Sequence, residues 1–121
     1  PGTDSPGAAS VAAMAEANGF DGSSPFAPES YDAAALIMLA MQAAGSSSSA
    51  DYKSKVMEVA NAPGVKIFPG ELAKGLKIIA DGGDIDYVGG SAVELIGPGE
   101  SAGAYRQIEM KDGKITTMQY R

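Results

Sequence analysis

The segment PESYDAAALIMLAMQAAG, residues 28–45, decides the fold. From Ala33 to Ala44 every residue except Gln42 is Ala, Leu, Ile or Met, so a helix formed here has no polar face. A helix that is apolar on all sides is a buried helix. The run is also too short to cross a membrane, which takes roughly 18 or more apolar residues. We therefore expect protein to cover this helix on most sides.

Residue types at both ends of the segment predict where the helix begins and ends. Pro28 and Glu29 suit a first turn, and Asp32 complements the positive helix end. Ser30 offers a capping oxygen. Gly45 suits the left-handed conformation that commonly ends a helix. We expect the helix to begin near Pro28 and to end at Gly45.

The composition indicates a globular protein and excludes several kinds of chemistry. The 121 residues are 45% hydrophobic, and such a length can bury about two thirds of the unfolded surface. The net charge is −6 and the basic residues are scattered singly, which argues against a nucleic-acid surface. Without Cys or His there are no thiol nucleophiles, disulfides, Cys/His zinc sites or histidine bases. Because the chain opens at Pro1 without a Met or a signal peptide, we interpret it as a processed or excised piece.

Hydrophobic spacing predicts the remaining elements. Helical spacing indicates further helices over residues 8–18, 50–61 and 71–81. Extended backbone is expected at residues 65–68, and alternation predicts strands over residues 91–96, 105–110 and 115–119. Asp112-Gly113 is a strong hairpin signal between the last two strands. Turns or linkers are expected at residues 1–7, 20–28 and 46–49, the last a flexible run of serines.

No stretch of the sequence assembles an active site or a metal site. The DGGDID segment, residues 81–86, lacks the glycine and the bidentate glutamate of a calcium loop, so a helix-to-strand turn is favoured. GPGES, residues 97–101, lacks the Gly-Lys-Ser/Thr of a phosphate loop and reads as a strand connection. Serines 46–49 have no base beside them. We predict no catalytic residue, no metal and no cofactor.

Four residues lie where the linker enters the central helix: Phe26, Glu29, Ser30 and Tyr31. An aromatic ring beside a carboxylate and hydroxyl groups is the composition of a small-ligand wall. The alternative is that Phe26 and Tyr31 simply close the core over the start of the helix. We name all four as candidate ligand-binding residues and leave both interpretations open.

Three stretches in series resemble a known family. SYDAAALIMLAMQAAGS (residues 30–46), PGELAKGLKIIADGGDIDYVGGSAVEL (69–95) and AYRQIEMKDGKI (104–115) resemble the C-terminal part of periplasmic solute-binding proteins of branched-chain amino acid ABC transporters. The similarity covers nearly the whole chain. It departs at Ala92-Val93 and at Gly97-Pro98-Gly99-Glu100, where the family often has Gly-Pro and an Asp-Asn-Gly turn.

The resemblance implies an α/β fold, the C-terminal fragment of a two-lobed type I periplasmic binding protein with helices first and a strand-rich tail. Residues 1–24 would end the second lobe, 25–104 would form part of the first lobe, and 105–121 would be a crossover strand and terminal hairpin returning to the second lobe. Phe26 falls on the family's ligand-contacting aromatic position. The residues that hold the ligand's carboxylate and ammonium would belong to sequence outside this chain.

The implied function is the extracytoplasmic component of an ABC transporter, which captures a small polar ligand, an amino acid, by hinge closure. The implied partners are this ligand, a membrane permease, and the missing N-terminal part of the protein or a swapped copy, but no nucleic acid. The location would be periplasmic or extracellular, after removal of a signal peptide from the precursor. Alternatives are a ligand-sensing module of a receptor or regulator, a carboxylate-based hydrolase, and a self-sufficient structural domain.

Overall fold

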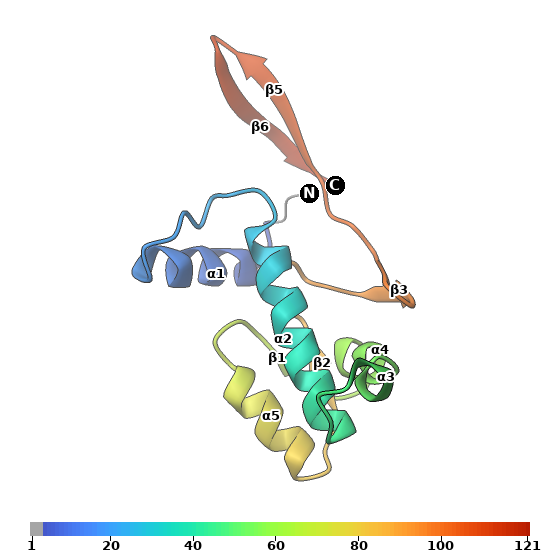
Figure 1. The fold of residues 1–121 in the computed structure, drawn as a ribbon. Coiled ribbons are helices and arrows are strands. Elements are labelled where there is room, and N and C mark those ends of the chain that lie inside the picture. Colours follow the sequence, from blue (N-terminus) through green and yellow to red (C-terminus); the bar gives the residue numbers. More distant parts are fainter. Residues whose placement is uncertain (1–3) are drawn as a thin grey trace.

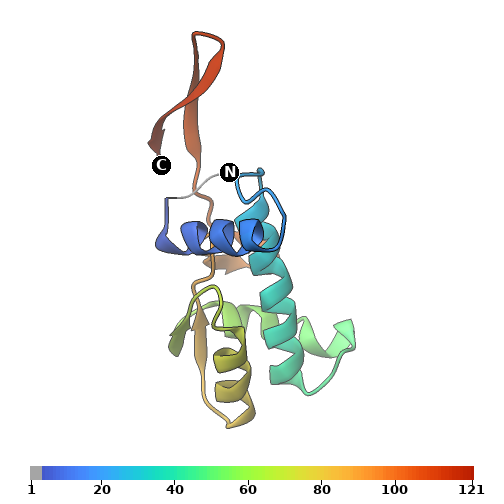
Figure 2. The ribbon, with the colours of Figure 1, turned by 90° about the vertical axis from the view of Figure 1, so that its left-hand side faces the viewer.

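The computed structural model describes residues 4–121 of the chain as an α/β fold (Figure 1). Of the turn expected at residues 1–7, the first three residues lie outside this range. In chain order the elements are α1 (Pro6–Ala17), α2 (Ala27–Ala44), α3 (Ser49–Tyr52), α4 (Lys55–Ala60), β1 (Val65–Ile67), α5 (Leu72–Ala80), β2 (Ile85–Tyr87), β3 (Leu95–Gly97), β4 (Glu100–Ser101), β5 (Arg106–Lys111) and β6 (Lys114–Tyr120). Helices and the strands β1 and β2 form a body, from which the hairpin β5–β6 projects in both views (Figures 1 and 2).

The central helix α2 begins within one residue of Pro28 and ends before Gly45, as predicted, but the predicted cap is absent. Gly45 follows it with φ 63°, in the left-handed conformation. At the other end the flanking residue is Phe26, also left-handed with φ 66°, and no side chain caps the helix. The predicted cap by Ser30 is therefore wrong, because Ser30 lies inside the first turn and its N–H donates to the Phe26 carbonyl at 2.9 Å.

One face of α2 forms the centre of the core. Leu39 and Ala40 on this face are fully buried, and they belong to a cluster with residues of α4, β1 and β2: Val59, Ala60, Ile67, Ile85 and Tyr87. Helix α5 approaches closely because Gly75 has no side chain; a Cβ there would lie 3.0 Å from a methyl carbon of Leu39. The core is thus built around α2, as the sequence predicts.

The opposite face of α2 is open. Ile37 and Met38 are 40% and 43% exposed, so the expected cover on most sides of this helix is not provided by residues 4–121. Part of this face borders an apolar groove of about 740 Å³, whose other walls are α3, α4 and the turn after β3. The side chains of α2 that are buried are Asp32, Ala35, Leu36, Leu39 and Ala40.

The strands β1 and β2 confirm the α/β class. They are parallel, with Val65 opposite Ile85 and Ile67 opposite Tyr87, and α5 connects them. Parallel neighbours require such a crossover. The extended stretch predicted at residues 65–68 and the helix predicted at 71–81 are both confirmed within a residue.

Two predicted elements are wrong. The helix expected over residues 50–61 is divided at Lys53 and Ser54 into α3 and α4. The strand expected over 91–96 begins only at Leu95, whose N–H and carbonyl both pair with the side-chain amide of Asn61. The residues before it turn instead, because a buried carboxylate binds their N–H groups, as described below.

The terminal hairpin is confirmed, with Asp112 and Gly113 at φ 51° and 74° as the tight turn requires. Cross-strand pairing puts Ile108, Met110 and Ile115 on one face of the ribbon. The register shifts once: Gln107 pairs with Gln119 but Ile108 pairs with Thr117, which leaves Met118 as an extra residue in β6. Both faces of the ribbon are largely exposed.

Candidate functional site

A buried carboxylate joins the start of α2 to the loop after β2. Asp32 is 2% exposed and accepts four hydrogen bonds. Its Oδ1 accepts from the Tyr87 hydroxyl at 2.9 Å and the Gly90 N–H at 2.7 Å, and its Oδ2 accepts from the Ser91 N–H at 2.7 Å and the Ser91 hydroxyl at 2.5 Å. These donors satisfy a charge that would otherwise be costly to bury. Asp32 therefore does more than complement the helix end.

The phenol of Tyr87 is held in its neutral, donating form. Tyr87 is 1% exposed. Burial, together with the nearby Asp32 carboxylate, raises the pKa of Tyr87 well above its ordinary value of 10.0. The hydroxyl consequently remains a donor to Asp32 at any physiological pH.

The loop at residues 89–91 approaches Asp32 more closely than a side chain would permit. Gly89 has φ 62°, and a Cβ at this position would collide with the Asp32 carboxylate. The Ser5 hydroxyl donates to the Gly90 carbonyl at 2.8 Å, which ties the start of α1 to the same loop. The loop is thus fixed from two sides.

Glu29 lies in the first turn of α2, three residues before Asp32, and its environment is the opposite. It is half-buried, and within residues 4–121 its carboxylate has no hydrogen bond or ion pair. It borders two hollows of the surface. We call them the Tyr105 hollow and the Arg106 hollow.

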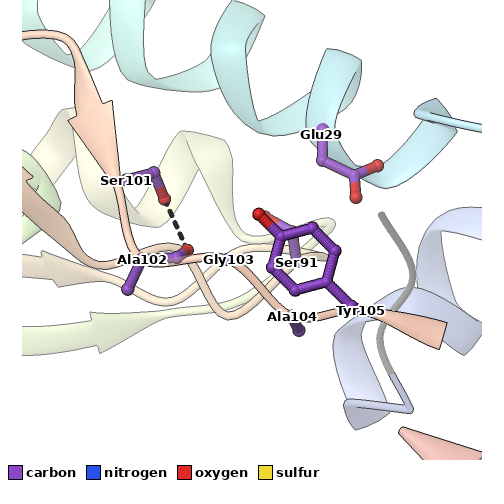
Figure 3. Close-up of a pocket in the computed structure, with 7 residues that line it drawn as sticks. All are labelled: Glu29, Ser91, Ser101, Ala102, Gly103, Ala104 and Tyr105. Carbon is purple, nitrogen blue, oxygen red and sulfur yellow. Dashed lines mark hydrogen bonds between the residues drawn. The ribbon is translucent and has the colours of Figure 1, made fainter. Parts of the chain in front are cut away.

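The Tyr105 hollow, of about 170 Å³, lies between α2 and the segment that leads to the hairpin (Figure 3). Besides Glu29 its lining is Ser91, Ser101, Ala102, Gly103, Ala104 and Tyr105. The Ser101 hydroxyl donates to the Ala102 carbonyl at 2.9 Å, and the Ser91 hydroxyl donates to Asp32. The hollow therefore combines a carboxylate, two hydroxyl oxygens and an aromatic ring.

The Arg106 hollow, of about 140 Å³, also borders Glu29. Its walls include Phe26, Pro28, Arg106 and Tyr120. It offers a guanidinium and a carboxylate, together with two aromatic side chains. This arrangement suits a small ligand that carries both charges.

The structure brings together two of the four predicted ligand-binding residues. Phe26 and Glu29 border the Arg106 hollow. Ser30 is exposed and lines neither hollow, and the Tyr31 hydroxyl accepts from the Gly70 N–H at 3.0 Å, beside the turn before α5.

Apart from Phe26 and Glu29, the residues that line the two hollows were not predicted as site residues; those with polar or aromatic side chains include Ser91, Ser101, Tyr105, Arg106 and Tyr120. Ser91 lies in a stretch that carries the family resemblance, and Tyr105, Arg106 and Tyr120 lie in the predicted crossover tail.

Residues 4–121 contain no cluster of three or more His, Cys, Asp or Glu side chains that could hold a metal ion. In the DGGDID segment, Asp81 pairs instead with Lys77 at 2.7 Å and Asp86 lies in β2. Within the same range, none of the helices has the length and apolar character needed to cross a membrane.

Comparisons of the chain with known proteins do not identify this site. No protein-family model, no curated protein and no solved structure matches the chain.

Proposed function

We propose that the chain is part of an extracytoplasmic solute-binding protein, which captures an amino acid between two lobes and presents it to a membrane permease. The observation that carries this proposal is the unpaired carboxylate of Glu29, placed between two hollows. The proposed role is binding without chemical turnover.

The charges beside the Arg106 hollow complement a zwitterion. Glu29 and Arg106 both border this hollow, and within residues 4–121 neither forms an ion pair with the other. The ammonium of an amino acid is attracted to Glu29, and its carboxylate matches the two-pronged guanidinium of Arg106. Phe26 and Tyr120 offer apolar surface to the ligand's side chain.

The size of the hollows supports a two-lobed clamp. Each is smaller than the roughly 300–1,000 Å³ of a typical ligand site and stays open to solvent. A ligand bound here alone would keep much of its surface in water. A second lobe that closes over it would supply the missing wall, and the ligand would favour the closed state.

Two uncovered apolar surfaces also support a companion lobe or a swapped copy. One is the groove beside α2, and the other is the hairpin face with Ile108, Met110 and Ile115. Exposed apolar surfaces of this kind are typical of sites where protein packs on protein. Two of the three segments that carry the family resemblance also meet in space, because Asp32 binds Tyr87, Gly90 and Ser91.

Calorimetric titration tests the proposal. The protein, with the sequence that precedes Pro1 included, is titrated with a panel of amino acids, amides and small carboxylates. We expect at least one amino acid to bind, and Phe26→Ala to weaken this binding about tenfold through lost apolar contact. Phe20→Ala is the matched control, because Phe20 is 71% exposed and lines neither hollow. Absence of binding across the panel would contradict the proposal.

A further inference from the structure

We infer that the Tyr105 hollow is a recess for a primary ammonium group. This deepens the proposed function, on which it rests for the identity of the ligand, by assigning one part of the ligand to one hollow. The inference uses the hydrogen-bond directions, the charge and the ring that border the hollow.

The hydroxyl groups of the hollow are arranged to accept hydrogen bonds. Ser91 gives its only hydroxyl hydrogen to the Asp32 carboxylate, and Ser101 gives its hydrogen to the Ala102 carbonyl. Each oxygen keeps lone pairs that can accept from a ligand. A group that donates hydrogen bonds fits these oxygens, and a primary ammonium has three N–H donors.

The charge that borders the hollow is negative. Among the described residues that line the hollow, Glu29 is the only Asp, Glu, Lys or Arg. Its carboxylate is unpaired within residues 4–121. Arg106 lines the neighbouring hollow and not this one. The N–H groups at the start of α2 oppose a cation, but their effect is small compared with a full carboxylate charge. The hollow thus favours a cation over an anion.

The ring of Tyr105 provides the remaining wall. It is 65% exposed and lies against Gly103, where a Cβ would come within 2.9 Å of the Tyr105 hydroxyl oxygen. In Figure 3 the Glu29 carboxylate lies up and to the right of this ring, on the helix that forms the facing wall. An ammonium group near an aromatic face gains a cation–π interaction. The volume of about 170 Å³ leaves room for such a headgroup.

An NMR titration with simple amines tests the recess. The 121-residue chain is titrated with methylammonium chloride at constant ionic strength, and the shifts of the Tyr105 ring and the Glu29 side chain are followed. We expect saturable shifts at both residues and about tenfold weaker binding in Glu29→Gln, which removes the charge but keeps the shape. Glu16→Gln on the exposed part of α1 is the matched control and leaves binding unchanged. A well-dispersed spectrum of each variant shows that it is folded.

Tetramethylammonium chloride distinguishes a recess that accepts hydrogen bonds from one that attracts any cation. It carries the same charge but no N–H group, so we expect it to bind at least about fivefold more weakly than methylammonium. Equal binding of the two cations, or unchanged binding in Glu29→Gln, would overturn the inference. If amino acids bind in calorimetry while methylammonium leaves Tyr105 and Glu29 unshifted, the inference fails and the proposed function stands. If methylammonium binds while no amino acid binds, the ammonium recess stands and the proposed function fails.

Discussion

Asp32 and its hydrogen-bond partners Tyr87, Gly90 and Ser91 form a buried junction, the Asp32 junction. This junction and the β5–β6 hairpin hold their backbone in opposite ways. The Asp32 junction joins residues more than fifty positions apart through hydrogen bonds to one carboxylate that is 2% exposed. The hairpin is formed by neighbouring residues, and its apolar face stays open, with Met110 66% and Ile115 61% exposed. A two-stranded hairpin alone is marginally stable in water. The difference teaches that stability in this chain is concentrated where distant segments share a buried polar group.

The largest effect is expected at the Asp32 junction itself. Asp32→Asn replaces an accepting oxygen by a donating amide, which leaves N–H groups of the loop facing hydrogens. We expect a loss of about 3 kcal/mol in the free energy of unfolding, measured by urea denaturation. The exposed Asp84→Asn is the control and should change it by less than about 0.5 kcal/mol. Equal midpoints for the two variants would show that the carboxylate does not hold the loop.

An intermediate effect is expected in the pH dependence of stability. The raised pKa of Tyr87 means that above about pH 10 the unfolded chain releases this proton while the folded chain keeps it. The contribution of Tyr87 to the free energy of unfolding is fully present below that pH and falls by about 1.4 kcal/mol per pH unit above it. Tyr87→Phe should remove this slope in denaturation curves recorded at alkaline pH. Tyr120→Phe leaves Tyr87 in place and should retain it, so loss of the slope in both variants would refute the assignment.

The smallest effect is expected in the hairpin. Replacing Met110 and Ile115 together by Ala should change the free energy of unfolding of the body by less than about 0.5 kcal/mol, because both side chains are already exposed. Leu39→Ala in the core should cost about 3 kcal/mol. Hydrogen exchange should also be faster for hairpin amides than for those of Leu39 and Ile67. A loss comparable to that of Leu39→Ala would show that hairpin and body unfold as one unit.

Local rules predicted the features that depend on local geometry. Gly45 ends α2 and Asp112-Gly113 forms the hairpin turn, because in both places the backbone needs a left-handed conformation that few residues adopt. The strand predicted from Ser91 begins only at Leu95, since nothing adjacent in the sequence shows that Asp32 will bind the N–H groups of Gly90 and Ser91. The spacing of hydrophobic residues does not indicate contacts between residues so far apart in the sequence.

The candidate site was predictable to a similar extent. Phe26 and Glu29 were found because they stand at the start of a recognisable helix. Tyr105 and Arg106 were missed as site residues, because only the folded chain brings them beside Glu29. The apolar sequence of α2 likewise predicted burial without indicating which face this chain would cover.

The extra residue Met118 in β6 has a consequence for behaviour at high concentration. A ribbon with an apolar face and two free edges is a template on which further molecules can add strands. The bulge at Met118 interrupts the regular spacing of N–H and carbonyl groups along one edge, and Lys111 opposite Lys114 places like charges near the tip. Both features disfavour regular stacking of this hairpin into fibrils.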